Sequence, residues 1–471
     1  MTFTLNLSRE DMRALGYRIV DILVEHFQDL PEKPVTRKAD RPTMETRLRQ
    51  AIPEQGANAL EVLDQLQQDV FSNIMHTDHP RFFAFVPSPS NFVGVMADAL
   101  VSGFNVFAGT WLEASGPTQI ELVTVDWLRQ ACGLPDSASG LFVSGGSMAN
   151  MTALAVARHI KLGDRIEGAA VYFSDQTHSS IERGLRVLGF QDHQMHKIQS
   201  DDCFRLDVSA LQRAVKADRA SGRLPFCVVA NAGTTNTGAI DPLPALADYC
   251  HQEGLWLHVD GAYGAAAVFC ERGQALLEGL ARVDSMSLDP HKWLFQPYEI
   301  GCVLVREERW LKETFHILPE YLADIERREG EVNFCDRGIQ LTRGFRALKL
   351  WMSFQVFGRA GFQEAVNRGF EMSEIAEAAV RELPNWQVVT PAQMGVVTFR
   401  CVPEGLSPEK LNRLNRELVD EMIADGFAMI SSTMLRGQTV LRMCTINPRT
   451  IKADVRETIE RLDNMSKRLL Q

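Results

Sequence analysis

The sequence predicts an α/β protein built around a largely parallel sheet, and two observations support this fold class. Between about residues 140 and 305, short apolar runs alternate with segments of helical periodicity. The runs are almost continuously apolar, which is typical of strands buried on both faces of a parallel sheet. The runs are LFV, AAVYF, FCVVA, LWLHVD, SMSL and GCVLV, and helices are expected at 147–160, 178–188 and 243–253.

The regions on either side of this unit have different patterns. Residues 10–27 predict an amphipathic helix, and the proline-rich, charged stretch PEKPVTRKADRP follows it, so we expect the helix to pack away from the main core. After Leu350, helices near 360–382, 407–425 and 451–469 and the strand-like GVVTFRCV indicate a smaller α+β domain. We therefore divide the chain into an N-terminal helical segment (1–78), a large domain (79–355) and a small C-terminal domain (356–471).

Composition excludes several classes of function. A formal net charge of -11 opposes nucleic-acid binding, and no apolar run is long enough for a membrane helix. The N-terminus does not have the pattern of a signal peptide. Nine cysteines are an odd number, and with no CxxC pair they favour neither a disulfide framework nor a zinc ribbon. The cytosol is the expected compartment.

The segment SMSLDPHKWL places Lys292 directly after a predicted buried strand, beside His291. A lysine at a strand end is ordinarily a surface residue. Near an aldehyde cofactor, however, it can form a Schiff base, and a partly desolvated, electropositive site would lower its pKa and free the lone pair for attack.

A carboxylate ends the preceding apolar strand, in LWLHVDGAYGAA. Asp260 could simply cap a turn, but a carboxylate at this position can also pair with the protonated ring nitrogen of pyridoxal phosphate. Since ligands of such sheets lie at the carboxyl ends of the strands, Asp260 and Lys292 are expected to hold one flat cofactor between them.

Three further strand ends carry polar groups. Glycine-rich SGGSMAN, at 144–150, joins a strand to a helix and fits a monophosphate better than a dinucleotide, because no GxGxxG is present. His178 follows the next strand and could lie flat on a cofactor ring, and Thr235 in NAGTTNTGAID offers a hydroxyl near the ring. Each is also compatible with an ordinary loop. His193 and His196 have ligand-like spacing, but without a third ligand we expect a solvated loop and no metal site.

These segments, in this order, resemble the group II pyridoxal-phosphate decarboxylases, which include aromatic-L-amino-acid, histidine and glutamate decarboxylases. The resemblance covers nearly the whole chain and extends to HPRFFAFVPSPS, TWLEASGPTQIELVTVDWL and RGIQLTRGFRALKLWMSFQVFG. It implies the type I aminotransferase-like fold, pyridoxal 5'-phosphate as cofactor, and a homodimer in which both subunits contribute residues to each site.

The resemblance also implies roles for particular residues. Lys292 would be the Schiff-base lysine, Asp260 the partner of the ring nitrogen and His178 the ring-stacking residue. Ala262 and Thr235 would be further ring contacts. Gly146 and Ser147 match the phosphate loop, and His291 matches the histidine next to the lysine.

Tyr321, in ILPEYLADIERREGEVNF, matches the loop tyrosine that returns a proton to the α-carbon after carbon dioxide has left. The family's aldehyde synthases have phenylalanine at this position. Two departures concern only details: Met148 stands where many relatives have glutamate, and Asp289 where the aromatic enzymes often have asparagine.

The substrate is expected to be an aromatic L-amino acid. Phe83, Phe85, Pro87 and Trp111 match positions that line the substrate side chain in the aromatic enzymes. Thr342 matches a position where glycine admits bulky rings, so threonine favours smaller rings than that of tryptophan.

Four alternatives remain. They are a decarboxylase of glutamate, histidine or diaminobutyrate, an aromatic aldehyde synthase, an aminotransferase on the same fold, and a catalytically silent dimeric scaffold.

Overall fold

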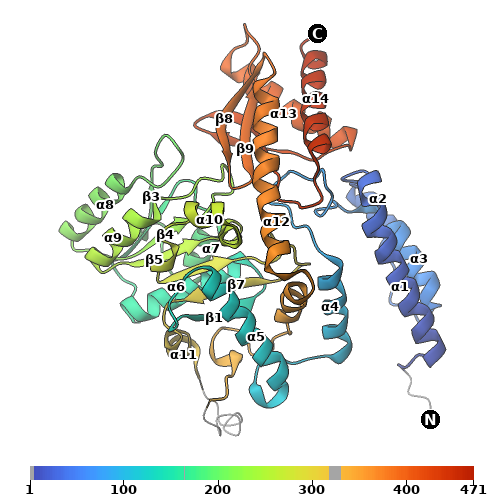
Figure 1. Ribbon diagram of the computed structural model, residues 1–471, viewed down its shortest axis with the longest axis horizontal. Helices are drawn as coiled ribbons and strands as arrows, with labels where there is room; N and C mark the ends of the chain where they lie inside the picture. Colours follow the sequence, from blue (N-terminus) through green and yellow to red (C-terminus); the bar gives the residue numbers. More distant parts are fainter. Residues whose placement is uncertain (1–4, 164, 318–329) are drawn as a thin grey trace.

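A seven-stranded sheet lies at the centre of the molecule, with the strand order β1-β7-β6-β5-β4-β2-β3 (Figure 1). The computed structural model describes residues 5–163, 165–317 and 330–471. The strands of this sheet are β1 (Ser139–Val143), β2 (Ala169–Ser174), β3 (Met195–Ile198), β4 (Leu224–Asn231), β5 (Trp256–Asp260), β6 (Ser285–Leu288) and β7 (Gly301–Val305).

The strands β3, β2, β4, β5 and β6 run parallel to one another, and β7 is antiparallel to both of its neighbours, β1 and β6. In β5, β6 and β7 every residue is buried, as continuous apolar runs require when helices cover both faces of a sheet. The largely parallel α/β sheet predicted from the sequence is therefore confirmed.

Helices pack on both faces of this sheet. The helices expected at 147–160, 178–188 and 243–253 are present as α6 (Gly146–Leu162), α7 (Ser180–Val187) and α9 (Leu243–Glu253). The sequence pattern does not predict α4 (Phe92–Phe104), α5 (Trp111–Ala131) or α8 (Val208–Ala220). Helix α6 buries a row of small residues against β5, β6 and β7, which lets its backbone approach the sheet closely. The helices of this domain are α4 (Phe92–Phe104), α5 (Trp111–Ala131), α6 (Gly146–Leu162), α7 (Ser180–Val187), α8 (Val208–Ala220), α9 (Leu243–Glu253), α10 (Glu271–Leu276) and α11 (Arg309–Phe315).

A second, antiparallel sheet with the order β10-β11-β9-β8 forms the smaller C-terminal unit. Its strands are β8 (Trp386–Gln393), β9 (Val396–Cys401), β10 (Ser431–Leu435) and β11 (Gln438–Cys444), and its helices are α12 (Ala347–Arg381), α13 (Pro408–Asp425) and α14 (Lys452–Leu469). The boundary predicted between residues 355 and 356 falls inside α12, close to Gly358, where a φ of 65° interrupts the helix. Helix α12 therefore joins the two units.

The N-terminal segment forms three helices that lie to one side of the main body, α1 (Arg9–Asp29), α2 (Arg41–Leu48) and α3 (Ala59–Asp69) (Figure 1). The predicted helix at 10–27 is thus present as α1, and none of its residues is buried. Short 3₁₀ helices complete the described elements: η1 (Leu30–Glu32), η2 (Phe71–Asn73), η3 (Asp192–Gln194), η4 (Gly264–Phe269), η5 (Leu280–Arg282) and η7 (Phe334–Asp336).

All nine cysteines are free thiols, and seven of them are buried. Within the described part of the chain, every helix is too short or too polar to cross a lipid bilayer. The solvated loop expected for His193 and His196 is wrong for His196, which is half-buried on strand β3 beside Asp218 and Arg223.

Candidate active site

A cavity of about 530 Å³ opens at the carboxyl ends of the parallel strands. Asp260 is the last residue of β5, and Lys292 follows β6 after a short turn. The two strands are paired, with Asp260 opposite Ser287, so the parallel register brings the two predicted groups to one edge. The cavity lining includes nine residues singled out from the sequence: Phe85, Gly146, Ser147, His178, Thr235, Asp260, Ala262, His291 and Lys292.

The Asp260 carboxylate is held by three hydrogen bonds. Its Oδ1 accepts from the Ser287 hydroxyl and from the Ala262 backbone N–H, both at 3.1 Å, and its Oδ2 accepts from the Asn150 amide at 3.0 Å. Because a carboxylate has about four acceptor positions, Oδ2 can accept one more hydrogen bond. The carboxylate is therefore fixed in direction and still able to bind a cationic N–H.

The Lys292 ammonium forms an ion pair with Asp289, at 2.8 Å from Oδ2. Burial disfavours the charged lysine, but the attraction of Asp289 and of Asp260 outweighs it and raises the pKa of Lys292. The sequence had predicted an electropositive site that lowers this pKa. The structure contradicts that prediction, because the Asp289 carboxylate lies against the lysine.

The glycine-rich turn between β1 and α6 lines the cavity. Helix α6 begins at Gly146 with no side chain capping its first turn. A Cβ on Gly146 would lie 2.8 Å from Asp289 Oδ2 and 3.0 Å from the Ala262 Cβ. A larger side chain at this position would therefore clash with these two residues. An uncapped helix N-terminus with free N–H groups is a suitable cradle for a phosphate.

Two histidines lie beside the lysine and the carboxylate. Partial loss of hydration lowers the pKa of His178, against the opposite effect of Asp260. Burial likewise lowers the pKa of His291, although Asp289 acts in the opposite direction, and its Nδ1 donates to the Ile300 carbonyl at 2.7 Å. Both pKa shifts favour neutral imidazoles.

The predicted substrate residues are not all at this cavity. Phe85 lines it, but Phe83 is fully buried in the core of the small sheet, which contradicts its assignment to the pocket wall. Successive residues of an extended segment point in alternating directions, yet the left-handed φ of 49° at Phe85 breaks that alternation. Pro87 is buried, Trp111 half-buried and Thr342 exposed, and none of them lines the cavity.

Tyr321 lies outside the described residues. Sequence reasoning also missed lining residues that the structure brings into the cavity, notably Asn150, Ser180 and Tyr263. Asn150 is four residues after Gly146 and so lies on the same face of α6, a spacing that would have indicated it.

The residues of this cavity fit pyridoxal phosphate. It contains an amine for the aldehyde, a fixed carboxylate with a remaining acceptor position for the ring nitrogen, and an uncapped helix N-terminus for the phosphate. A fold and a donor set of this kind define a pyridoxal-phosphate enzyme of the type I fold.

Comparisons with known proteins agree. Residues 42–402 match the family model described as the pyridoxal-dependent decarboxylase conserved domain. An aromatic-L-amino-acid decarboxylase of Bacillus atrophaeus is 53% identical over 452 residues, covering 96% of this chain and 94% of that protein. A phenylacetaldehyde synthase of Arabidopsis thaliana is 28% identical over 464 residues, covering 96% and 95% of the two chains. The crystal structure of Oryza sativa TDC with PLP and tryptamine superimposes with a TM-score of 0.94 at 29% identity over the whole of both chains.

The chain therefore belongs to the pyridoxal-dependent decarboxylase family. It is a pyridoxal-phosphate-dependent amino-acid decarboxylase, a carboxy-lyase, and the fold and cofactor predicted from the sequence are confirmed.

Proposed function

We propose that this enzyme removes carbon dioxide from an aromatic L-amino acid and releases the corresponding amine. The relative from Bacillus atrophaeus, which is named for this activity, is 53% identical over nearly the full chain. The Phe85 ring at the cavity provides an apolar surface for a flat substrate side chain.

Within the cavity, each residue has a proposed task. Lys292 holds the cofactor covalently through its aldehyde carbon, and Asp260 keeps the ring nitrogen protonated. His178 and Ala262 contact the ring, and Gly146 binds the phosphate with its backbone N–H. Ser147 adds a hydroxyl to the phosphate site, and Thr235 and His291 lie at the edge of the ring. When bound, pyridoxal phosphate supplies an electron-poor ring that accepts the electron pair of the breaking carbon–carbon bond.

The observation that carries this proposal is the arrangement of Asp260 and Lys292 at the ends of two paired strands. The three donors to Asp260 fix the direction of its carboxylate, while one acceptor position of Oδ2 remains free. The chain thereby holds a proton on the ring nitrogen without reorganising, which is the condition for withdrawing electrons from the substrate.

The proton that replaces the carboxylate on the α-carbon comes, we propose, from Tyr321. This assignment rests on the sequence motif around it. The neutral His178 is a second polar group at the cavity, and it is suited to orienting the substrate carboxylate.

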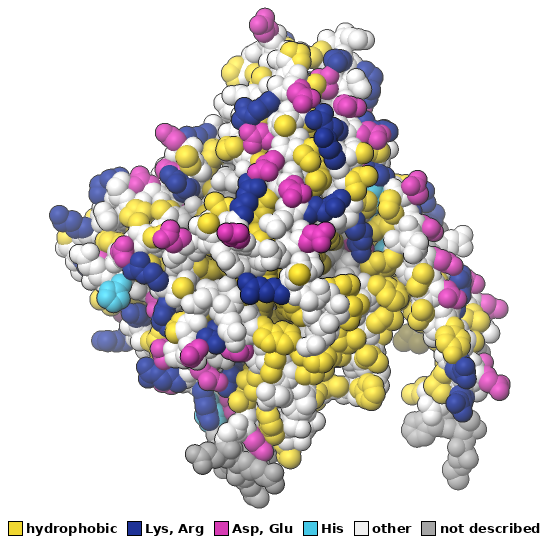
Figure 2. Space-filling model, viewed as in Figure 1, with side chains coloured by type: hydrophobic (Ala, Val, Ile, Leu, Met, Phe, Trp, Pro, Cys, Tyr) yellow, Lys and Arg dark blue, Asp and Glu magenta, His cyan; other side chains and the backbone are white. Residues whose placement is uncertain are grey.

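The working form is, in this proposal, a homodimer. Figure 2 shows hydrophobic side chains gathered beside the N-terminal helices, over α4 and the first half of α12. The exposed large apolar residues there include Leu100 and Phe104 on α4 and Val356 and Phe357 on α12. Exposed apolar patches of this kind mark protein interfaces. Trp111 and Thr342, which do not line the cavity of their own chain, would then contribute to the partner's site.

One set of measurements tests this function. Purified enzyme is incubated with a panel of L-amino acids plus dihydroxyphenylalanine, and amine and carbon dioxide are quantified. We expect aromatic substrates to be preferred. We also expect Lys292→Ala to remove the near-visible absorbance of the covalently bound cofactor, and Asp260→Asn to weaken cofactor binding. Full activity of Lys292→Ala would overturn the proposal, and a preference for glutamate or histidine would overturn the aromatic assignment.

An aromatic aldehyde synthase is the second candidate, since a phenylacetaldehyde synthase is among the relatives. The tyrosine at position 321 favours the decarboxylase. Aldehyde, ammonia and peroxide in place of amine would identify the alternative.

A further inference from the structure

A buried chain of hydrogen bonds runs from the indole of Trp256 to the carboxylate of Asp260. Trp256 Nε1 lies 2.8 Å from Ser285 Oγ, and Ser285 Oγ lies 2.9 Å from His258 Nδ1. His258 Nε2 lies 3.0 Å from Asn150 Oδ1, and the Asn150 amide nitrogen lies 3.0 Å from Asp260 Oδ2. The four residues that lead to Asp260 are at most 1% exposed.

The chemistry at the Asp260 end fixes the direction of every bond. An ionised carboxylate only accepts, so the Asn150 NH₂ must face Asp260 and its carbonyl must face His258. His258 must then carry its proton on Nε2, because that nitrogen donates to the Asn150 carbonyl. Burial lowers the pKa of His258 to about 4, so the ring is neutral and its Nδ1 accepts from the Ser285 hydroxyl.

The Trp256 end of the hydrogen-bond chain is consistent with these donor and acceptor assignments. The Trp256 indole N–H can only donate, and Ser285 is left with lone pairs that accept it. Each donor therefore faces an acceptor along the whole chain. Such a directional network resists reversal, because turning one member would leave buried groups unpaired.

A branch of the same network reaches the predicted ring-stacking residue. The Asn150 amide also donates to Ser180 Oγ at 3.0 Å, and Ser180 Oγ lies 2.9 Å from His178 Nδ1. The Ser180 backbone N–H points at the same Nδ1 at 3.2 Å. His178 Nδ1 is therefore an acceptor, and the proton of the neutral ring resides on Nε2.

We propose that Asn150 and His258 are positioning residues, which together fix the Asp260 carboxylate and the His178 tautomer for the cofactor. This inference rests on the proposed roles of Asp260 and His178. Without His258, the buried Asn150 carbonyl loses its hydrogen-bond donor, so the amide that donates to Asp260 and Ser180 is held less firmly. Asp260 would then hold the ring proton less firmly, and His178 would lose its preferred tautomer.

The test compares variants by cofactor affinity and by the pH dependence of the bound cofactor's absorbance, besides activity. We expect His258→Leu and Asn150→Leu to weaken pyridoxal phosphate binding to the apo-enzyme about tenfold or more and to shift the absorbance titration. His258→Gln, whose side-chain amide can still donate to Asn150, should restore most of both. Asn415→Leu is the matched control, because Asn415 is a fully buried amide with three hydrogen bonds in the C-terminal unit.

Two outcomes separate this inference from the proposed function. If Asp260→Asn weakens cofactor binding but His258→Leu behaves like Asn415→Leu, the positioning roles are rejected and the function of Asp260 stands. If Asp260→Asn changes neither affinity nor absorbance, the proposed role of Asp260 itself fails.

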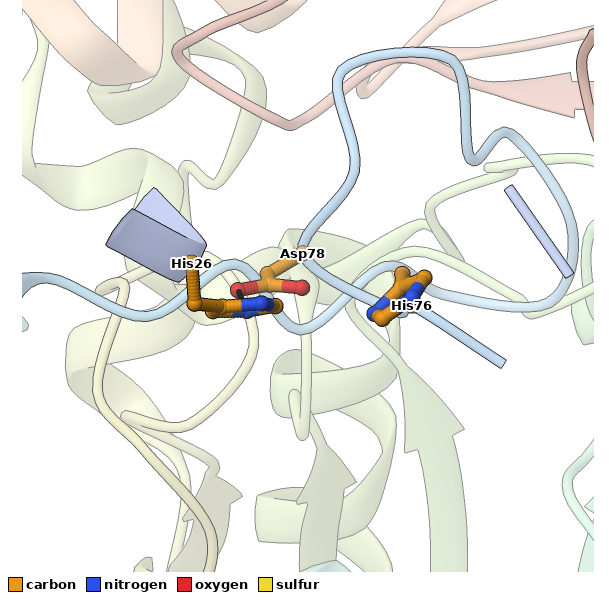
Figure 3. Close-up of side chains that lie close together, drawn as sticks. All are labelled: His26, His76 and Asp78. Carbon is orange, nitrogen blue, oxygen red and sulfur yellow. Dashed lines mark ion pairs between the residues drawn. The ribbon is translucent and has the colours of Figure 1, made fainter. Parts of the chain in front are cut away.

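An independent observation concerns the N-terminal helix. His26 on α1 and His76 and Asp78 in the loop after η2 converge on one point, with their candidate ligand atoms within 4.8 Å of one another (Figure 3). His26 Nε2 lies 3.5 Å from Asp78 Oδ2, close to the separation of two ligands on one tetrahedral ion. His76 Nδ1 is buried and has no hydrogen-bond partner.

We infer that these three residues form a binding site for a zinc-like divalent cation, which ties α1 to the body of the enzyme. Two imidazoles and a carboxylate are a suitable donor set for zinc, with water as the fourth ligand. Helix α1 has no buried residue, so a metal link here would contribute more to its position than a link inside a packed core. The cationic groups of Lys33 and Arg449 are nearby and oppose binding, so a moderate affinity is expected.

Calorimetric titration of the holoenzyme with zinc chloride tests this site. We expect one saturable zinc per chain in the wild type, and its loss in His26→Gln, His76→Gln and Asp78→Asn. His26→Gln changes a helix without buried residues, so this variant should remain folded. His193→Gln is the matched control and should bind like the wild type. The absence of saturable binding, or binding that persists in His26→Gln and His76→Gln alike, would overturn the inference.

Discussion

Arg343 and Glu121 form an ion pair in which both side chains are almost completely buried, with 2.5 Å between Arg343 Nη2 and Glu121 Oε1. Arg343 also donates to the carbonyls of Ala108 and Phe142, and Glu121 accepts from the Phe142 backbone N–H. The pair thus joins two of the segments that carry the family resemblance. It fixes helix α5 and strand β1 against the stretch that carries Thr342.

Breaking this pair should be costly. Glu121→Ala leaves a buried guanidinium without its counter-charge, and we expect a loss of about 3–5 kcal/mol in the free energy of unfolding. Chemical denaturation measures it. Glu417→Ala removes a partner from the exposed pair Arg413–Glu417 and should leave the denaturation midpoint unchanged. Equal losses of stability in Glu121→Ala and Glu417→Ala would contradict the view that the buried ion pair stabilises the fold.

The buried His258 predicts a pH dependence of stability. Its pKa is lowered to about 4 in the folded chain by burial, against an ordinary value near 6.5 in the unfolded chain. Between these values the unfolded state binds more protons, so this contribution to stability is complete above about pH 6.5 and is lost as the pH falls toward 4. Urea midpoints across this range should fall less steeply in His258→Gln than in the wild type. Parallel curves would show that His258 does not contribute.

Asp289 should slow the covalent attachment of the cofactor. Attack on the aldehyde requires the neutral amine, and Asp289 helps to raise the pKa of Lys292. In Asp289→Asn this pKa falls, and each unit increases the neutral fraction about tenfold. Stopped-flow absorbance of apo-enzyme mixed with pyridoxal phosphate at neutral pH should therefore show faster imine formation. A slower reaction would indicate that Asp289 serves the cofactor in another way.

Tyr321→Phe should change the products. Without the phenol, protonation of the α-carbon slows and molecular oxygen can react there first, which gives aldehyde, ammonia and peroxide. Oxygen uptake and aldehyde formation should rise together as amine falls. If the variant still forms amine at the full rate, Tyr321 is not the proton donor.

Phe85 and Phe83 offer a matched pair of substitutions. Phe85→Ala removes an exposed ring at the cavity and should reduce kcat/KM for aromatic substrates by up to about tenfold with little change in stability. Phe83→Ala empties a fully buried position in the small sheet and should cost about 3–5 kcal/mol of stability. The reverse pattern would show that the cavity assignment of these rings is wrong.

The sheet is predictable from the apolar runs of the sequence. Much of the candidate site is predictable as well, because functional residues in this architecture lie at the ends of the strands. The apolar runs before Asp260 and Lys292 predicted both the sheet and the edge at which the two residues meet. The helical spacing of Asn150 from Gly146 could have indicated Asn150, but Ser180 depends on a contact between α6 and α7 that no local pattern encodes. Phe83 was misassigned because the left-handed backbone at Phe85 cannot be read from a non-glycine sequence.

Helix α1 was foreseen to stand apart, but its relation to His76 and Asp78 was not. About fifty residues, including η1, α2, α3 and η2, separate His26 from them, so spacing alone could not join them. The ion pair between Arg343 and Glu121 was hidden for the same reason.

The sparse packing of α1 on its own chain has a practical consequence for handling the enzyme. In the proposed homodimer, a helix that buries so little against its own chain would owe much of its position to association, and association weakens as the sample becomes more dilute. Specific activity should thus decline in very dilute assays and recover when the stock is reconcentrated, and truncating the first thirty residues should mimic the dilute state at any concentration.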